Sequence, residues 1–350
     1  MHYTSRHVSS RHVSAPRLGG LALGLAALGL AALAPSARAQ TQDLFVSNGS
    51  GNTISRFAGT GPGTFSTTAT TLSGLNAPQG LAFDAGGDLF AANYSNNSIT
   101  EFASTGAGTF ATGTTFATGG TLNKPNGLAF DARGDLFAAN LYGNSITEFA
   151  STGAGTFAAG TTFATGGTLN GPVGLAFDAR GDLFAANYTG NTITEFAFNS
   201  GTGTFGAGTT FATGGTLNQP VGLAVDARGD LFAANIIGNS ITEFASTGAG
   251  TFAAGTTFAT GLNGPFGLAV DARGDLFTTN GGNSITEFAS TGTGTFAAGK
   301  TVETGLSQPS FLAFSPAPAV PEASTTVSLG LLLALGMGGM VVAAKRKKRA

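Results

Sequence analysis

The stretch Gly127–Asn140 reads GLAFDARGDLFAAN, and the chain repeats these fourteen residues with little change. The other copies lie at Gly80–Asn93, Gly174–Asn187, Gly222–Asn235 and Gly267–Asn280. The Asp of GDLF measures their spacing, which is 47, 47, 48 and 45 residues from Asp88 to Asp275. A partial copy begins at Asp43, 45 residues before Asp88. A repeat of this length predicts one propeller blade of four short strands per copy.

Within one copy, short runs rich in Phe, Leu, Ala and Thr are separated by turn residues. The turns read Asp-Ala-Arg-Gly, Gly-Asn and Ser-Thr-Gly-Ala-Gly, and a Leu-Asn-x-Pro-x-Gly segment leads into the next copy. The Pro of this lead-in ends a strand and its Gly frees the backbone, so one blade gives way to the next there. In the second full copy we expect strands at Leu128–Asp131, Asp135–Asn140, Ser145–Ala150 and Thr161–Thr165.

The two ends of the repeat region complement each other. It begins inside a copy at Asp43, whereas its last segment, Leu306–Phe314, matches only a lead-in and a first strand. Residues 311–315 should therefore form the innermost strand of a blade whose other strands come from residues 43–72. This predicts an all-β, six-bladed propeller over residues 40–316, closed by its N- and C-terminal strands. Closure leaves no end blade with an uncovered apolar face.

The repeat resembles a known family. Gly174–Ile193 is similar to the NHL-repeat consensus, which runs roughly G-[IL]-A-V-D-x-x-G-[ND]-[IL]-[YF]-V-A-[DN]-x-x-N-N-x-[IV]. The resemblance covers the whole predicted ring and implies an NHL-like β-propeller. It also implies lactonase and streptogramin-lyase-like propellers as functional candidates. Where the family usually has Asp after V-A, this chain has Asn48, Asn93, Asn140, Asn187, Asn235 and Asn280.

Residues 1–39 are predicted to be a secretory signal peptide. A region with three Arg precedes the 13-residue apolar run Leu21–Leu33, and Ala37 and Ala39 flank Arg38 in a small-x-small cleavage pattern. A membrane anchor is the alternative, although the apolar run is short for a membrane span. Cleavage after Ala39 would remove all three histidines of the chain.

The C-terminal region is predicted to have three parts: a linker at 317–326, a transmembrane helix at 327–344 and a basic cytoplasmic tail at 345–350. With Val320, Pro321 and Glu322 ahead of the helix, this order resembles a bacterial PEP-CTERM sorting segment. The resemblance implies processing by an exosortase, although Ala323 stands where the motif has its second Pro. A plain membrane anchor is the alternative. The predicted location is the outer surface or the extracellular matrix, after transient anchoring in the inner membrane.

Composition narrows the functional classes. Residues 40–320 hold 17 acidic and 7 basic side chains, a net charge of −10, which argues against nucleic acid as a partner. The chain has no Cys and, once the signal peptide is cleaved, no His. It therefore lacks the commonest general base, a thiolate nucleophile and soft metal ligands. We expect no catalytic residue, no cofactor and no metal.

The acids recur at equivalent positions, as turn pairs such as Asp84 and Asp88 and as a third-strand Glu such as Glu101. A catalytic site usually needs different groups in different roles, so this repetition favours turn formation. Calcium binding by the oxygen-rich rings is the alternative, although no EF-hand spacing is present. The repeated Asn is expected to satisfy backbone groups at a strand end.

Variation between copies is concentrated in two kinds of loop that should emerge on one face: the loop between the second and third strands, and the lead-in around Pro. Such loops on a rigid scaffold commonly carry binding residues, and Tyr is a good contact residue. We predict a ligand-binding face here, with neutral drift of duplicated loops as the alternative. The predicted residues are Tyr94, Tyr142, Tyr188, Lys124, Asn126, Ile236, Ile237 and Phe266.

Three functions are compatible with these features. The leading hypothesis is a non-enzymatic surface or matrix protein that binds extracellular polysaccharide or a surface protein. The second is an enzyme of the lactonase or streptogramin-lyase type, which an asymmetric cluster of acids in the central channel would favour. The third is a passive structural unit without a ligand.

Overall fold

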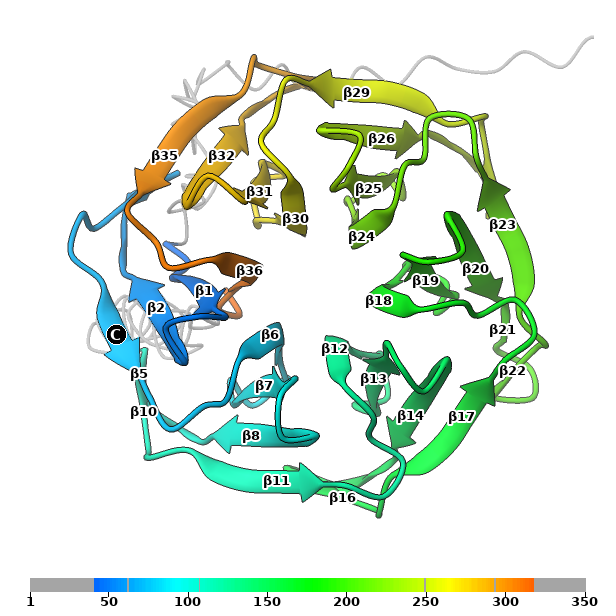
Figure 1. Ribbon diagram of the computed structural model, residues 1–350, viewed down its shortest axis with the longest axis horizontal. Coiled ribbons are helices and arrows are strands. Elements are labelled where there is room, and N and C mark those ends of the chain that lie inside the picture. Colours follow the sequence, from blue (N-terminus) through cyan, green and yellow to red (C-terminus); the bar gives the residue numbers. More distant parts are fainter. Residues whose placement is uncertain (1–40, 62, 107, 249, 293, 318–350) are drawn as a thin grey trace, which may run out of the picture. The chain divides into compact units, whose positions relative to one another are not determined.

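The computed structural model describes residues 41–317, except residues 62, 107, 249 and 293. Six four-stranded antiparallel sheets surround a central axis (Figure 1), which confirms the predicted six-bladed, all-β propeller. No helix occurs among the residues described.

Each blade runs outward from the axis through four strands. The innermost strands are β6 (Pro78–Phe83), β12 (Pro125–Phe130), β18 (Pro172–Phe177), β24 (Pro220–Val225), β30 (Pro265–Val270) and β36 (Pro309–Phe314). The second strands are β1 (Leu44–Asn48), β7 (Leu89–Asn93), β13 (Leu136–Asn140), β19 (Leu183–Asn187), β25 (Leu231–Asn235) and β31 (Leu276–Asn280). The third strands are β2 (Thr53–Phe57), β8 (Ser98–Phe102), β14 (Ser145–Phe149), β20 (Thr192–Phe196), β26 (Ser240–Phe244) and β32 (Ser284–Phe288). The fourth strands are β5 (Thr70–Leu72), β11 (Thr114–Thr118), β17 (Thr161–Thr165), β23 (Thr209–Thr213), β29 (Thr256–Thr260) and β35 (Lys300–Thr304).

One sheet joins the two ends of the described chain. Its strand order is β36-β1-β2-β5, and Leu44 lies opposite Phe314. The side-chain amide of Gln42 donates to the carbonyl of Ser315 at 2.6 Å, and the N–H of Asp43 donates to Ser315 Oγ at 2.9 Å. These contacts confirm the predicted closure of the ring by its N- and C-terminal strands.

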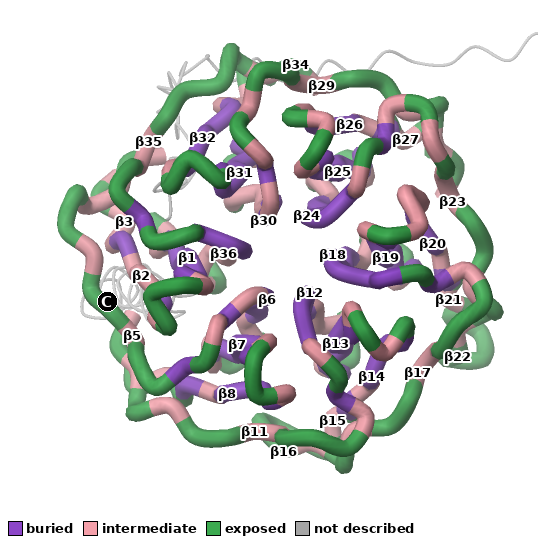
Figure 2. Tube along the Cα trace, viewed as in Figure 1, coloured by how far each residue is buried: buried purple, intermediate pink, exposed green. Residues whose placement is uncertain are grey.

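The apolar core lies between the blades. Every residue of the second strands is buried, whereas the fourth strands are half-buried or exposed (Figure 2). Phe90 of one blade, for example, packs with Leu128 and Leu136 of the next. Because neighbouring blades cover both faces of a second strand, its sequence LFAAN lacks the polar alternation of a half-exposed strand.

The innermost strands begin earlier than predicted. β12 starts at Pro125 rather than Leu128, and a bulge follows the pairing of Pro125 with Asn140. A Pro is tolerated at the first residue of a strand or at a bulge. A side chain at Gly127 would collide with the carbonyl oxygen of Val173 in the next blade, so Gly permits the close approach of the inner strands.

A two-stranded ribbon follows the third strand of each blade, where the sequence had predicted only a turn. Its Phe reaches the preceding blade: the ring centroids of Phe157 and Phe90 are 5.7 Å apart, and the six equivalent pairs span 5.5–5.9 Å. Edge-to-face pairs of this kind add about 0.5–1.5 kcal/mol each beyond area burial. The ribbons are β3 (Gly59–Gly61) with β4 (Thr64–Phe65), β9 (Ser104–Gly106) with β10 (Thr109–Phe110), β15 (Ser151–Gly153) with β16 (Thr156–Phe157), β21 (Phe198–Asn199) with β22 (Thr204–Phe205), β27 (Ser246–Gly248) with β28 (Thr251–Phe252), and β33 (Ser290–Gly292) with β34 (Thr295–Phe296).

The repeated Asn at the end of each second strand has the predicted structural role. Asn140 Oδ1 accepts from the N–H of Asn123 at 3.0 Å, and its Nδ2 donates to Thr147 Oγ1 at 2.9 Å. The bond to the lead-in backbone recurs in five of the six blades. In the remaining blade Asn280 Oδ1, which is buried, has no partner among the described residues.

A second set of Asn residues links each blade to the next and was not predicted. Asn97 has a left-handed backbone, with φ of 55°, which Asn tolerates better than most residues. Its Oδ1 accepts from the N–H of Lys124 in the following lead-in at 2.8 Å. The same interblade bond, at 2.7–3.0 Å, is made by Asn52, Asn97, Asn144, Asn191, Asn239 and Asn283.

Several predictions concern other parts of the chain. The signal peptide with Ala37 and Ala39, the sorting motif Val320-Pro321-Glu322, the transmembrane helix at 327–344 and the basic tail lie outside the described residues. Among the residues that are described, no helix is long and apolar enough to cross a membrane.

Candidate functional site

The two faces of the ring differ in chemistry. We call the face that carries the turns between first and second strands the acidic face. The opposite one, which carries the loops between second and third strands and the lead-ins, is the tyrosine face. These loops touch directly: the N–H of Tyr94 donates to the carbonyl of Ala77, and that of Leu141 to the carbonyl of Lys124, each at 3.2 Å. The structure thus places the predicted variable loops together.

On the acidic face, the Asp side chains hold the turns. Asp131 Oδ1 accepts from the N–H groups of Arg133 and Asp135, each at 2.9 Å. Asp135 Oδ1 accepts from the N–H of Ser151 at 2.7 Å. The guanidinium of Arg133 bridges both carboxylates, at 2.7 and 3.0 Å. The predicted role of these acids as turn formers is therefore visible in their contacts.

The Glu of each third strand lies beside these turns. Burial raises the pKa of Glu148, the charge of Asp135 raises it further, and Arg133 opposes the shift. Burial is also the first cause of the raised pKa of the equivalent Glu101, Glu195, Glu243 and Glu287. Perturbed carboxyl groups often mark active sites. Here the same perturbation recurs blade after blade, so it reflects crowding of acids within the repeat.

Within the described part of the chain, no group of three or more His, Cys, Asp or Glu could hold a metal ion. In the four blades with Arg in this turn, the Asp oxygens that the calcium alternative would need are already engaged. Asp178 Oδ1, for example, accepts from the N–H of Asp182 at 2.9 Å, and its Oδ2 pairs with Arg180 at 3.2 Å.

On the tyrosine face, the loop between second and third strands offers two positions of different kinds. At the first position, Leu141, Tyr188 and Ile236 are partly buried against an apolar cluster around the axis. At the second position, Tyr142 is 66% exposed and Ile237 is 60% exposed. The three predicted Tyr are therefore not equivalent, because Tyr142 stands one position further along its loop than Tyr94 and Tyr188.

Three predicted residues form what we call the tyrosine patch: Tyr94, Tyr142 and Lys124. The ring centroids of the two Tyr are 6.2 Å apart in an edge-to-face arrangement. Lys124 Nζ lies 4.8 Å from the Tyr94 ring centroid and 3.4 Å from the carbonyl oxygen of Ser95. Burial, followed by the hydrogen bond and the charge of Tyr142, raises the pKa of Tyr94 to about 12. The Tyr94 hydroxyl thus keeps its proton at neutral pH.

Near the axis, apolar side chains occupy the tyrosine-face end of the ring. Phe311 stands where the other inner strands have Gly, and it clusters with Val173 and Val221 of other blades. Phe266 meets the Phe311 ring edge-on, with centroids 5.3 Å apart. We call this group the axial cluster. Tyr188 and Ile236 pack on its rim, so these predicted residues lie with Phe266 and apart from the tyrosine patch.

The strand that carries Phe311 is braced by two hydroxyls. Ser47 Oγ accepts from the N–H of Phe311 at 2.9 Å and donates to its carbonyl at 3.1 Å. Thr279 Oγ1 donates to the carbonyl of Ser310 and accepts from the N–H of Gly267 at 2.9 Å. The other blades have Ala at the positions of Ser47 and Thr279. Phe311 was not predicted as a site residue, although the sequence shows that it replaces the Gly of the Pro-x-Gly pattern.

Asn126 lies beneath the tyrosine face rather than on it. It follows Pro125 on β12, is 4% exposed, and its Oδ1 has no hydrogen-bond partner among the described residues. Val173 and Val221 occupy the same inner-strand position in other blades and belong to the axial cluster. A buried amide oxygen of this kind needs a hydrogen-bond donor such as an ordered water.

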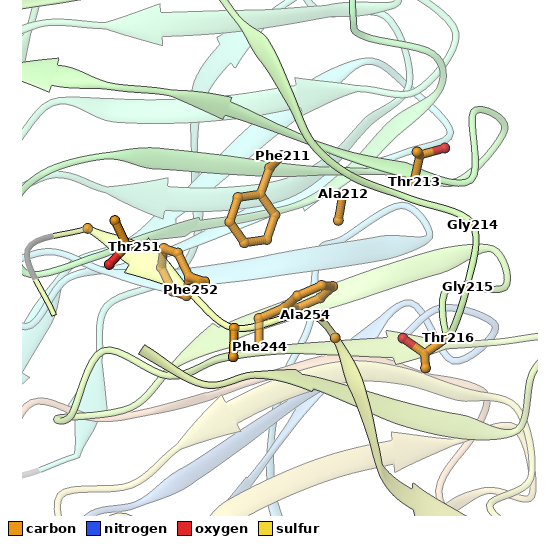
Figure 3. A pocket seen from close by; sticks show the side chains of 13 residues that line it. Phe211, Ala212, Thr213, Gly214, Gly215, Thr216, Phe244, Thr251, Phe252 and Ala254 are labelled. Atoms are coloured by element: carbon orange, nitrogen blue, oxygen red, sulfur yellow. The ribbon is translucent and has the colours of Figure 1, made fainter. Parts of the chain in front are cut away.

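Hollows of about 570, 590 and 330 Å³ lie at three blade boundaries, on the outside of the ring. In one of them the rings of Phe211, Phe244 and Phe252 gather beside the Gly214–Gly215 turn (Figure 3). The other two share this Phe, Ala, Thr and Gly lining, and one of them also includes Glu101. The shared part of the lining recurs from blade to blade, so the hollows themselves follow from the repeat.

Comparisons with known proteins support the fold alone. No family model matches the chain, and no curated protein matches it. A propeller from a nidogen/laminin complex is 19% identical, with a TM-score of 0.63, and covers 79% of this chain and 99% of its own. A streptogramin B lyase is 16% identical, with a TM-score of 0.55, and covers 78% of this chain and 86% of its own. A putative 6-phosphogluconolactonase from Bacteroides fragilis is 21% identical, with a TM-score of 0.56, and covers 75% and 80%.

These three neighbours differ in what their names say they do, although their fold is shared. The chain is thus a six-bladed β-propeller that resembles NHL-type propellers. Since one fold occurs in a nidogen/laminin complex, a streptogramin B lyase and a putative 6-phosphogluconolactonase, function has to be argued from this chain's own residues.

Proposed function

We propose that this chain is an exported, non-enzymatic propeller that binds an extracellular ligand through its tyrosine face. The tyrosine patch carries the proposal. Tyr94, Tyr142 and Lys124 break the repetition of the ring and gather an aromatic pair and a cation in one place. An exposed aromatic ring with a hydroxyl suits contact with sugars or protein surfaces at modest entropic cost.

Three features favour binding over catalysis. The acids of the acidic face are engaged in turns and ion pairs, as for Asp131 and Asp135. The axial cluster around Phe311 places apolar side chains near the axis at the tyrosine-face end, where a central active site would need polar groups. The sequence has no His after residue 12 and no Cys. Lactonase or lyase chemistry therefore stands as the alternative, supported by resemblance of fold.

The test uses residues that the chain itself places at equivalent positions. Leu141 corresponds to Tyr94, and Ser95 corresponds to Tyr142. A Tyr94→Leu/Tyr142→Ser double variant should therefore fold while losing both aromatic contacts. In affinity electrophoresis through neutral and acidic polysaccharides, we expect it to bind more weakly than the parent by about 2 kcal/mol, taking about 1 kcal/mol per anchoring aromatic.

The matched control lies on the opposite face. Gly86 stands where the next copy has Arg133, so Arg133→Gly should leave binding unchanged. Equal loss of binding in the control and the double variant would argue against the tyrosine face as the site. Hydrolysis of glucono-lactone by the purified chain, abolished by a chelator, would overturn the proposal and favour the enzyme alternative.

Export and sorting are part of the same proposal. It places the mature N-terminus at Gln40 and a cut near Pro321 and Glu322 by an exosortase, which would leave the propeller on the outer surface or in the matrix. Intact-mass measurement of the protein released by an exosortase-bearing bacterium tests both ends. A mass that includes Met1 contradicts cleavage of the leader, and a mass that includes the Lys345–Arg349 tail contradicts sorting.

A further inference from the structure

We infer that the ligand of the tyrosine face is an acidic polysaccharide, whose carboxylate groups pair with Lys124 while its sugar rings pack on Tyr142 and Tyr94. The inference rests on the proposed function and adds the chemical class of the ligand.

The first argument is that Lys124 is available for an anion. All five Arg of the described residues pair with Asp on the acidic face. Lys300 lies opposite Glu287 in the β32–β35 pair. Lys124 is the remaining basic side chain in the described part of the chain, and its contacts there are with the Tyr94 ring and the carbonyl of Ser95. Its ammonium group therefore has no carboxylate of the described chain within ion-pair distance.

The second argument is the distribution of negative charge. Among the described residues, every Asp lies on the acidic face, in a turn or, for Asp43, at the matching position of the closing blade. The third-strand Glu of the other five blades lie beside the turns. The remaining acid, Glu303, is on β35, on the other side of the ring from the lead-in before β12 (Figure 1). A polyanion would be repelled from one face and attracted to the other near Lys124.

The third argument is the size and chemistry of the patch. A stable protein interface needs about 800 Å² from each partner, far more than two Tyr and one Lys provide. Two aromatic rings next to one ammonium match a chain of sugars, in which apolar ring faces alternate with hydroxyls and periodic charges. Exposed Ser95 and Asn96 beside the patch add hydroxyl and amide groups that suit sugar hydroxyls.

The backbone at Lys124 allows a clean test. Its φ is 55°, and Gln219 and Gln308 hold the equivalent positions with φ of 54° and 50°. Lys124→Gln should therefore fold without new strain while losing the charge. As a matched control, Lys300→Thr removes the other Lys and installs the residue found at the equivalent Thr256.

The experiment measures affinity electrophoresis of the full chain through polygalacturonate and through the same polymer after reduction of its carboxyl groups. We expect the parent to bind polygalacturonate about fivefold more tightly than the reduced polymer, a typical upper value for one exposed charge pair. Lys124→Gln should abolish this preference and its weakening by salt, and Lys300→Thr should keep both.

Each failure has a separate meaning. If both polymers bind equally and Lys124→Gln changes nothing, the inference is wrong, while a loss in the Tyr94→Leu/Tyr142→Ser variant would leave the proposed function standing. If polyglutamate binds as tightly as polygalacturonate, the tyrosine patch recognises negative charge and not sugar rings. The inference that the ligand is a polysaccharide is then wrong. If neither sugar polymer binds at all, the inference is wrong, and the ligand of the proposed function is not a polysaccharide.

Discussion

The acidic face and the tyrosine face are built from the same repeat but use it differently. On the acidic face, the side chains that contact one another recur in blade after blade, as in the pairing of Arg133 with Asp131 and of Arg228 with Asp226. On the tyrosine face, repeated Asn side chains fix the backbone, as Asn97 and Asn140 do, while the side chains between them differ from blade to blade. Repetition thus fixes the backbone on both faces and leaves the contact residues of one face free to vary.

Removing the strand that closes the ring should cause the largest loss of stability. A chain that ends at residue 305 lacks β36 and, with it, Phe311 of the axial cluster. We expect it to lose more than about 4 kcal/mol of unfolding free energy, since the buried side chains of Leu306, Phe311 and Leu312 are removed. A chain that ends at residue 317 should unfold like the parent. Equal melting temperatures for the two truncations would contradict closure by Phe311 and its strand.

The side-chain hydrogen bonds that hold the backbone on each face can be removed separately within one blade. Asp135 and Asn140 are both buried and hydrogen-bonded to backbone, so Asp135→Ala and Asn140→Ala should each cost about 2 kcal/mol. Asn280→Ala is the matched comparison, because Asn280 Oδ1 has no partner among the described residues, and we expect it to cost about 1 kcal/mol less. Urea unfolding measures all three. If Asn280→Ala costs as much unfolding free energy as Asn140→Ala, the hydrogen bond that Asn280 Oδ1 lacks does not contribute to stability.

The contact residues of the tyrosine face should have little effect on stability. Ile237 and Tyr142 are the most exposed large apolar side chains described, so Ile237→Ser and Tyr142→Ser should each change the unfolding free energy by less than about 0.5 kcal/mol. Thermal melts of both variants beside the parent would check this. A large loss for Tyr142→Ser would mean that the tyrosine patch supports the fold, which would remove the contrast between the two faces.

The smallest expected effect is a pH dependence confined to the acidic face. Burial raises the pKa of the five third-strand Glu in the folded chain above their ordinary value of 4.5. Each Glu then binds its proton more readily when folded, so the stability it contributes is full below about pH 4.5 and is lost as pH rises through the raised pKa. Glu287 is buried and the other four are half-buried, but a neighbouring Arg opposes the shift at Glu148, Glu195, Glu243 and Glu287, so the effect should be under about 0.5 kcal/mol per site.

A variant with all five of these Glu replaced by Gln isolates that effect. Its melting temperature should fall less than that of the parent between pH 4.5 and pH 7, because Gln has no proton to lose. Melts in a buffer series of constant ionic strength give the comparison. Identical pH profiles for the variant and the parent would contradict the assigned role of the Glu side chains.

Much of the fold was predictable because each copy of the repeat carries its own strand and turn residues close together in the sequence. The regular spacing of Asp88, Asp135 and the later copies set the blade length, and the incomplete segments near Asp43 and Phe311 predicted closure. The ribbons were missed because their strands are two or three residues long and rich in Gly. Their Phe contacts connect neighbouring blades, and a single copy of the repeat does not reveal such contacts.

The candidate site was predictable in its location but not in its internal arrangement. The loops that carry Tyr94, Tyr142 and Tyr188 were expected on one face, and the structure places them there. That Tyr94 joins Tyr142 and Lys124, while Tyr188 joins the axial cluster, depends on which way side chains lean across blade boundaries. Asn126 looked like a surface residue because it adjoins Pro125, yet the convergence of six inner strands buries it.

The bonds from Gln42 and Asp43 to Ser315 have a consequence for how the molecule can be displayed. The described chain enters beside β1 and leaves after β36 at the same edge of one blade, on the acidic side of the ring. A tether attached at either end, or at both, would therefore pull on that side. The tyrosine face would then point away from the surface to which the protein is attached. A force applied through both ends would act on the blade formed by β36, β1, β2 and β5, and not on the other five blades.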